Sequence, residues 1–235
     1  MKRMMMMAGA LLAAGAALGA ENTLTDQEKA DGWKLLWDGT TTEGWRSAGR
    51  PTFPDKAWEI KDGELSVIPK GGGGDIITTD MYTDFIFMAD FKLTKAANSG
   101  IKYFIDPKVH GGTSLEYQVL DPEHPDAKKG IDGNRKVAAF YDVLPAPRGE
   151  ALLKPLGEWN TAMIVSKGPH VEHWLNGEMV LAFERGSEAF RAAVAKSKFK
   201  DNPNWGETKT GHILLQDHSD RVSYRNIKIK VIGEK

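Results

Sequence analysis

Short segments in which apolar and polar residues alternate run along most of the chain, and turn-forming residues separate them. Residues 57–68 alternate on either side of Asp62-Gly63, and residues 170–184 alternate on either side of Asn176-Gly177. Alternation is typical of a strand with one buried face, and the Asn-Gly and Asp-Gly dipeptides favour the tight type I′ turn of a two-residue hairpin. The pattern therefore predicts two β-hairpins.

Six further segments are rich in β-branched and aromatic residues and are bounded by turn residues. No strand–helix–strand rhythm connects them, so the predicted fold is all-β, an antiparallel β-sandwich. One short helix is predicted in an insert at residues 187–198, where Ser187 can cap the N-terminus and an apolar face follows at helical spacing. The six additional strand candidates are residues 83–93, 99–106, 114–121, 159–166, 211–217 and 222–232.

The N-terminus has the pattern of an export signal. Two basic residues precede an uncharged run at positions 4–20 that ends in small residues, as in a cleaved signal peptide. The apolar run is short for a membrane-spanning helix, which needs ~20 residues. We therefore expect a protein that is exported to the periplasm or secreted, without a stable membrane span. The predicted organisation is a signal peptide at residues 1–20, a polar linker at 21–31 and one domain at 32–235.

Composition narrows the range of partners. The chain of 235 residues has a formal net charge of −1 and no cysteine. The absence of cysteine excludes disulfides and thiol catalysis, and the balanced charge does not favour nucleic acid or an acidic membrane surface. The glycine run at residues 71–74 lacks the Lys-Ser/Thr pair and the following helix of a phosphate-binding loop, so we interpret it as a surface loop. Small neutral partners fit best, and the oligomeric state stays open.

Polar residues interrupt two of the predicted core strands. Side chains two apart in a strand share one face, so Glu116 and Gln118 point to the same side. Gln216 and His218 repeat this spacing directly after two leucines, whereas Asp217 points to the opposite side and is expected to hold a turn or a neighbouring strand. A carboxylate beside an amide is costly to bury unless it is hydrogen-bonded or solvated. One interpretation is a solvent-facing edge, but the recurrence on two strands favours a cleft on a concave sheet face.

Two classes of side chain have competing interpretations. His170 and His173 are three apart, which places them on opposite faces of a strand, and His173 is either a cleft residue or a surface residue. No familiar metal-ligand spacing occurs. The sequence therefore requires no cofactor, although a divalent metal held by residues from distant strands is compatible with it. The seven tryptophans are expected mostly in the core, with no more than two as sugar platforms.

Seven motifs follow one another in a characteristic order: "GWKLLWDGTTTEGW", "WEIKDGELSV", "NSGIKYF", "EYQVLD", "KPLGEWNTAMIV", "HWLNGEMV" and "GHILLQDHSDRVSYRNIKI". The series, which spans residues 32–231, resembles the 3-keto-disaccharide hydrolase family. The resemblance implies a concanavalin-like lectin/glucanase jelly roll and activity on carbohydrates already oxidised at sugar carbon 3. The segments at residues 185–210 and 71–74 depart from the family pattern, so the resemblance does not extend to substrate specificity.

The implied substrate indicates a chemistry. A ketone at C3 acidifies the C2 proton, so a base can form an enediolate that expels the group at C1, and water then adds to the enone. Such a site needs a base, a donor for the enolate oxygen and an acid for the leaving oxygen. Direct hydrolysis by two carboxylates is the alternative.

With this resemblance, Glu116 is the candidate base, and His218 or His173 is the candidate proton donor. The candidate substrate-binding residues are Gln118, Gln216, Asn98, Asp121 and Asp142. For the two aspartates, hydrogen bonding in turns and at strand ends is an equal alternative.

The same fold also serves as a non-catalytic carbohydrate-binding module, and a structural domain of an envelope assembly is a third interpretation. Aromatic platforms without a buried acid–base cluster would favour the module. Convergence of Glu116, His173 and His218 would favour the enzyme.

Overall fold

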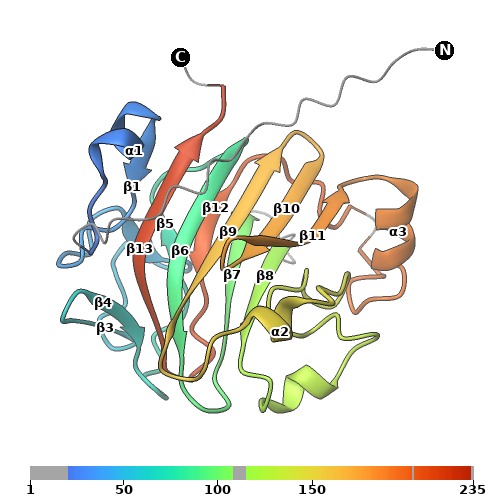
Figure 1. Ribbon diagram of the computed structural model, residues 1–235, viewed down its shortest axis with the longest axis horizontal. Helices are drawn as coiled ribbons and strands as arrows, with labels where there is room; N and C mark the ends of the chain where they lie inside the picture. Colours follow the sequence, from blue (N-terminus) through green and yellow to red (C-terminus); the bar gives the residue numbers. More distant parts are fainter. Residues whose placement is uncertain (1–20, 108–114, 203, 234–235) are drawn as a thin grey trace.

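The computed structural model describes residues 21–107, 115–202 and 204–233 (Figure 1). The predicted signal peptide at residues 1–20 lies outside the described residues. Within the described part of the chain, no helix is both long and apolar enough to cross a membrane.

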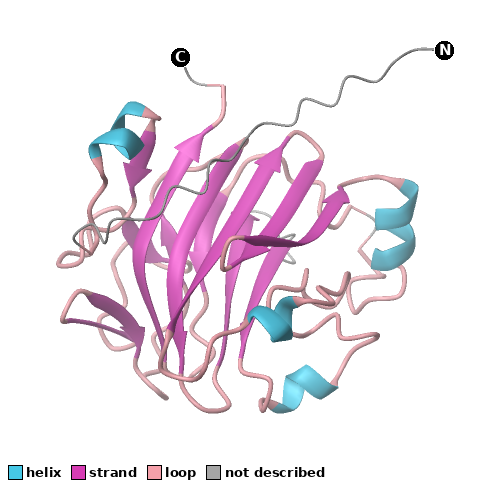
Figure 2. Ribbon diagram, in the orientation of Figure 1, coloured by secondary structure: helices cyan, strands magenta, loops and turns pink. Residues whose placement is uncertain are grey.

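Two antiparallel sheets make up the fold, and the predicted β-sandwich is confirmed (Figure 2). The larger sheet has the order β11-β10-β9-β6-β13-β4-β3, with β1 paired to β13, and the smaller sheet has the order β2-β5-β12-β7-β8. The strands are β1 Trp33–Leu35, β2 Trp45–Ser47, β3 Trp58–Lys61, β4 Glu64–Val67, β5 Ile76–Thr78, β6 Phe85–Leu93, β7 Asn98–Ile105, β8 Leu115–Leu120, β9 Trp159–Lys167, β10 His170–Leu175, β11 Glu178–Glu184, β12 His212–Leu215 and β13 Val222–Val231.

Both predicted hairpins are present, because their turn residues adopt the backbone conformation that the sequence favours. Asp62 and Gly63 join β3 to β4 with φ angles of 52° and 71°, and Asn176 and Gly177 join β10 to β11 with φ angles of 51° and 85°. Two successive positive φ angles define the type I′ turn, whose twist matches that of the flanking strands.

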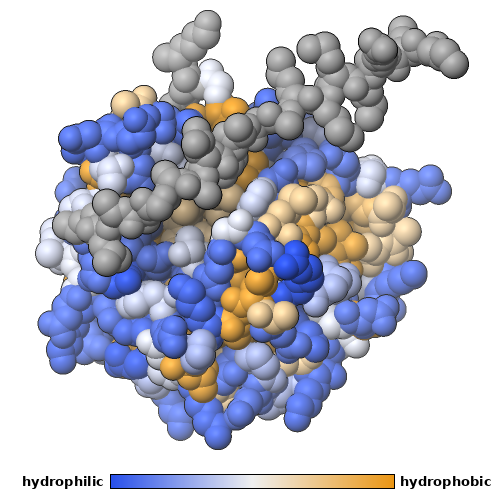
Figure 3. All heavy atoms as spheres, in the orientation of Figure 1, coloured by the Kyte–Doolittle hydropathy of each residue, from blue (hydrophilic) through white to orange (hydrophobic). Residues whose placement is uncertain are grey.

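The core lies between the two sheets and follows the alternation of the strands. β6 buries every second residue from Phe85 to Leu93, and β8 contributes Tyr117 and Val119 to the same apolar cluster. Four of the seven tryptophans, at positions 37, 45, 58 and 205, are buried in it, as expected for a sandwich core. On the face drawn in Figure 3, hydrophilic residues cover most of the surface and leave smaller apolar patches between them.

The insert contains the predicted helix, α3, which is shorter than expected and spans Glu188–Val194. Ser187 caps it by accepting a hydrogen bond from the Phe190 amide at 3.2 Å. Stacked aromatic rings join the insert to the rest of the domain: the ring centroids of Phe140 and Trp205 lie 5.3 Å apart, and those of Phe183 in β11 and Phe190 lie 6.0 Å apart. The insert therefore packs against the domain.

The expected polar linker at residues 21–31 is ordered. Its helix α1, Asp26–Ala30, begins with a capping box between Thr25 and Glu28, and Asn22 donates to the Gly63 carbonyl at 2.9 Å. Two further short helical segments, η1 (Pro125–Lys128) and α2 (Gly149–Leu152), were also not predicted. Each has no more than five residues, too few for an amphipathic period to be recognised in the sequence.

Candidate active site

The outer face of the smaller sheet carries polar side chains instead of apolar ones. In the register of β7 and β8, Lys102 lies opposite Glu116, and Gly100 lies opposite Gln118. The neighbouring Tyr103 and Tyr117 point into the apolar core, so these polar residues point away from it. The predicted alternation of β8 is therefore confirmed, and a carboxylate and an amide share one face.

Glu116 is enclosed in this face, with 9% of its surface exposed. Its Oε2 atom lies 3.8 Å from Nζ of Lys102, which comes from the adjacent strand. The carboxylate fits because Gly100 has no side chain: a Cβ there would lie 3.0 Å from Cδ of Glu116 and closer still to Oε1. Glycine inside a strand often marks such a close approach.

A second carboxyl group, that of Asp75, belongs to the same electrostatic cluster. Burial raises the pKa of Asp75, and Lys102 opposes this effect. Asp75 accepts a hydrogen bond from the Asp217 amide at 2.8 Å, while Asp217 accepts one from the Gly74 amide at 3.1 Å. Asp217 thus holds the loop before β5, which agrees with the structural role expected for it. We call Asp75, Lys102 and Glu116 the carboxylate–lysine cluster.

The environment of Glu116 suits a proton acceptor. Burial raises the pKa of its carboxyl group, Lys102 and Lys198 lower it in part, and Asp75 raises it further. A raised pKa makes the ionised carboxylate a stronger base than an ordinary glutamate. Raised carboxyl pKa values beside a specific cation are characteristic of functional sites.

The side-chain amides of Gln118 and Asn98 lie between Glu116 and His218. In the orientation of Gln118 that satisfies its neighbours, the amide nitrogen donates to Oε1 of Glu116 at 3.1 Å and to the Ser99 carbonyl at 3.3 Å. In the other orientation the Gln118 amide nitrogen donates instead to Oδ1 of Asn98 at 3.4 Å, and Nδ2 of Asn98 lies 3.4 Å from Nε2 of His218. These four polar side chains, predicted from the sequence, are brought together by β7, β8 and the loop after β12.

The insert brings a further cation to Glu116. The Tyr141 amide donates to the Glu116 carbonyl at 3.1 Å, so residue 141 extends the sheet beside β8. Nζ of Lys198 lies 4.2 Å above the Tyr141 ring. The Lys198 amide donates to Oδ2 of Asp142 at 2.7 Å, and the other carboxylate oxygen of Asp142 pairs with Arg135. Asp142 is therefore an anchor for the insert.

Of two other candidates from the sequence, Gln216 lies on the polar face and Asp121 lies in a turn. Gln216 follows β12, and its backbone amide donates to the Gly100 carbonyl at 3.0 Å. Gln216 therefore lies beside Gly100, which in turn lies opposite Gln118 in β8. The carboxylate of Asp121 accepts hydrogen bonds from the amides of Ala96 and Glu123 in the turn at the end of β8. The structure therefore favours the turn interpretation of Asp121.

His173 lies in neither of the two expected places, because it is a core residue with no exposed surface. Its Nε2 bonds with the Tyr103 hydroxyl at 2.9 Å, and its Nδ1 donates to the Ala138 carbonyl at 2.9 Å. Burial lowers the pKa of the imidazole to about 4. A neutral histidine with both nitrogens engaged inside the sandwich cannot contact a substrate, so we exclude His173 from the candidate site.

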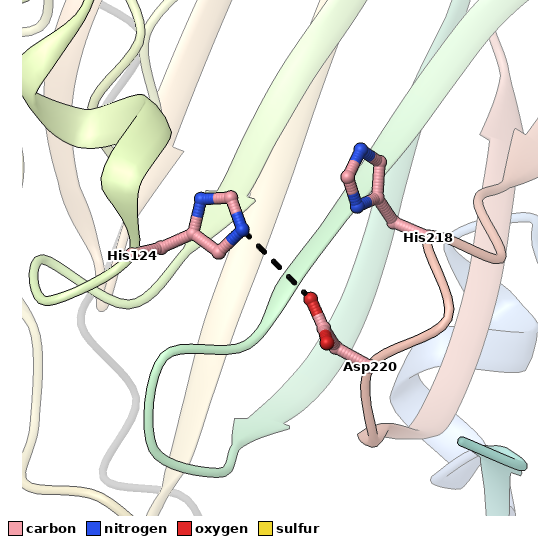
Figure 4. A group of neighbouring side chains, drawn as sticks. All are labelled: His124, His218 and Asp220. Atoms are coloured by element: carbon pink, nitrogen blue, oxygen red, sulfur yellow. Dashed lines mark ion pairs between the residues drawn. The ribbon is translucent and has the colours of Figure 1, made fainter. Parts of the chain in front are cut away.

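Three potential metal ligands converge at the end of the polar face. His124, His218 and Asp220 each offer a ligand atom, and these atoms lie within 4.8 Å of one another (Figure 4). Nε2 of His124 is 3.9 Å from Oδ2 of Asp220. The residue types suit a divalent transition metal. Nδ1 of His124 accepts the Asp126 amide at 3.1 Å, so ligation through Nε2 would give up this cap, a loss of about 1 kcal/mol. Metal binding, at roughly 10 kcal/mol or more in structural zinc sites, outweighs that loss.

Four residues near Glu116 were missed in the sequence: Asp75, Lys102, Tyr141 and Lys198. Lys102 had a usable signal, because it shares a strand face with Asn98 and Gly100. The others come from segments whose positions depend on long-range pairing and on the path of the insert.

Other surface hollows lie away from the polar face. One, of about 440 Å³, is lined by residues that include Asp84, Arg185 and Glu207. The Arg185 guanidinium packs over the Phe104 ring at 4.4 Å and donates to the Thr208 and Gly168 carbonyls. This guanidinium is thus engaged by backbone carbonyls of the protein itself. We therefore take the polar face, with its enclosed carboxylate, as the candidate active site.

Comparison with known proteins agrees with this architecture. A family model described as the 3-keto-alpha-glucoside-1,2-lyase-like domain matches residues 32–230. The chain belongs to this family. A 3-keto-disaccharide hydrolase from Bacteroides thetaiotaomicron is 36% identical over 234 residues, covering 86% of this chain and 79% of the relative.

Solved structures give the same result. A Parabacteroides distasonis protein named a glycosyl hydrolase superposes with a TM-score of 0.80 at 31% identity, covering 91% of this chain and 100% of that protein. A second protein from the same organism, with the same name, has a TM-score of 0.64 at 26% identity, covering 85% and 99%. This family member is thus a glycoside hydrolase-like enzyme with a glycoside-cleaving role.

Proposed function

We propose that the protein cleaves 3-keto-glycosides, including 3-keto-disaccharides, and that Glu116 removes the C2 proton of the oxidised sugar. The observation that carries this proposal is the enclosed Glu116 carboxylate, with its raised pKa, 3.8 Å from Lys102. A base beside a fixed cation is the arrangement that proton abstraction next to a ketone requires, because negative charge develops on the ketone oxygen. The relative's name supports the substrate class.

The reaction can be written with this chain's residues. Glu116 takes the proton from C2, and the electron pair of the C2–H bond forms an enediolate whose oxygen at C3 is stabilised by the Lys102 ammonium. Collapse of the enediolate breaks the bond between C1 and the leaving oxygen, which receives a proton, and leaves an enone. Water then adds its hydroxyl at C1 and a proton at C2. The exposed His218 is the proposed donor to the leaving oxygen, and Gln118, Asn98 and Gln216 orient the sugar.

A specific observation also keeps direct hydrolysis as a second candidate. Asp75 and Glu116 both have raised pKa values and share Lys102 as a neighbour. Two carboxylates on either side of a glycosidic bond can act as acid and nucleophile or base without a ketone. Lys102, which acts on both carboxyl groups, favours the ketone-dependent route, since this cation lowers both of their pKa values and would weaken an acid.

A binding module without catalysis is the less favoured alternative. Most of the tryptophans are in the core, while the polar face holds an enclosed carboxylate, a cation and two neighbouring amide side chains. Burial of these groups is costly, and a module that binds sugar by stacking does not need them.

The test compares a 3-keto-glucoside with the unoxidised glucoside, using purified wild type and Glu116→Gln. Glutamine preserves the shape but is not a base, so turnover of the 3-keto-glucoside should fall by roughly 100- to 10,000-fold. Glu43→Gln changes an exposed glutamate and is the matched control. Equal turnover by Glu116→Gln and wild type would refute the role of Glu116.

We also propose that the protein is exported, to the periplasm or beyond the cell, on the basis of its basic and apolar N-terminus. The mass of the intact protein from its native host should show the loss of about twenty residues. Full-length protein in the soluble cytoplasmic fraction of that host would contradict export.

A further inference from the structure

Two loops from different parts of the chain meet beside the polar face. His124 precedes η1, and His218 and Asp220 lie in the loop between β12 and β13 (Figure 4). The ligand atoms of the three residues lie within 4.8 Å of one another. We call them the histidine cluster.

Asp220 is held in place by the scaffold. Its Oδ2 accepts the Asn98 amide at 3.1 Å and lies 3.9 Å from Nε2 of His124. His218 is exposed, and its ring centroid lies 6.0 Å from that of His124. One ligand is thus fixed by a backbone hydrogen bond, while the exposed imidazole is free to adjust.

We propose that His124, His218 and Asp220 form a binding site for a divalent first-row transition metal ion, with open coordination positions on the solvent side. Two imidazoles and one carboxylate are the ligand set of many open metal sites, whereas calcium and magnesium prefer oxygen ligands. Ligand atoms of a tetrahedral first-row ion are about 3.4 Å apart, so the widest separation in the cluster would have to shrink by up to about 1.4 Å, through movement of the exposed His218 side chain. The exposed side of His218 leaves room for water or a substrate oxygen.

The place of the site gives it a role in the proposed reaction. Asn98 contacts the histidine cluster through both its amide groups: the backbone amide binds Asp220, and the side chain lies 3.4 Å from His218. Gln118 follows next towards Glu116: its amide nitrogen donates to Asn98 in one orientation and to Glu116 in the other. A metal ion there would lie next to the base and would polarise the leaving oxygen in place of proton donation by His218, because a ligating imidazole nitrogen has no proton to give. This part of the inference rests on the proposed function.

Binding is measured without any sugar. The purified protein is freed of metal with a chelator and titrated with Co²⁺, followed by the visible absorption of the ion, and with Zn²⁺ in competition. One equivalent should bind. His218→Ala should weaken the affinity at least about 100-fold, since even loss of a residue that only supports a ligand costs 10- to 100-fold.

Two further variants protect the test from misfolding and from binding elsewhere. His124→Asn removes the imidazole but keeps a side chain that caps a helical turn well, so loss of Co²⁺ binding in this folded variant supports the site. His170→Ala is the matched control, because His170 is a partly exposed histidine with carboxylate neighbours, Glu172 and Glu184. Those two carboxylates bind opposite ring nitrogens and cannot converge on one ion, so this variant should bind Co²⁺ as wild type does.

The outcomes separate the two proposals. Glu116→Gln should lose turnover and still bind one Co²⁺. A metal site without turnover on 3-keto-glucosides would contradict the proposed function alone. Absence of stoichiometric binding, or unchanged affinity in both His218→Ala and His124→Asn, would overturn the metal site and leave the role of Glu116 standing. Loss of binding in His170→Ala would also overturn it.

Discussion

Gly100→Ala should damage catalysis without damaging the fold. The added methyl carbon would lie 3.0 Å from Cδ and 3.1 Å from Cγ of Glu116, and closer to Oε1, where ordinary contacts begin at 3.4 Å. The atoms in the way belong to the end of a flexible side chain, so the carboxylate moves while the backbone of β7 and β8 stays in place. The substitution therefore displaces the proposed base specifically.

The size of the effect follows from the displacement. Relieving the contact requires Oε1 to move by about 1 Å, and a misplacement of that size can reduce turnover about 100-fold. Stability should change by no more than about 1 kcal/mol, because alanine lowers the entropy of the unfolded chain and offsets part of the strain. The same substitution at Gly49, where nothing lies within 4 Å of an added Cβ, should leave both quantities unchanged.

The assay is kcat for a 3-keto-glucoside together with the urea unfolding curve of each variant. A Gly100→Ala protein as active as wild type would refute the placement of the reaction at Glu116. A large loss of stability would show instead that the sheet, and not the side chain, had absorbed the methyl group.

Three other predictions follow from the charges. Lys102→Met should shift the acidic limb of the kcat/KM profile to higher pH, because Lys102 lowers the pKa of Glu116 and the base must be deprotonated; an unshifted limb would exclude Glu116. Lys198→Met should shift the same limb upwards for the same reason, whereas Lys196→Met, at an exposed position in the same insert, should not. The burial of His173, which lowers its pKa from 6.5 to about 4, contributes stability at neutral pH that is lost as the pH falls from 6.5 towards 4, roughly 3 kcal/mol at most. Urea unfolding of His173→Gln should lack this part of the pH dependence, and identical pH slopes for both proteins would contradict it.

Local sequence signals predicted the hairpins and strands, whereas long-range strand pairing determines which residues surround Glu116. Asp62-Gly63 and Asn176-Gly177 produce hairpins because the turn geometry depends on the dipeptide itself. The alternation of β8 placed Glu116 and Gln118 on one face for an equally local reason. Lys102 meets Glu116 only through the register of β7 and β8, which no window of the sequence contains.

His173 shows that a local signal can also be overlooked. In β10 His173 lies on the same strand face as Val171 and Leu175, which are both buried in the apolar core. The rule that placed Glu116 therefore assigns His173 to the interior. Lys198 reaches the site because stacked rings and Asp142 fix the path of the insert, and those contacts come from distant segments. Its position could not be predicted from periodicity.

The central claim is that the sugar loses its C2 proton, and the reaction in D₂O tests it most directly. Proton NMR of a 3-keto-glucoside incubated with wild-type protein should show either the enone or a 3-keto-sugar that carries deuterium at C2, because water supplies the proton that returns to that carbon. The free 3-keto-sugar in the same buffer without protein controls for spontaneous exchange, and Glu116→Gln should give neither product at the wild-type rate. Release of the aglycone with the original hydrogen still at C2, together with no primary isotope effect for a substrate deuterated at C2, would contradict the account and establish direct hydrolysis.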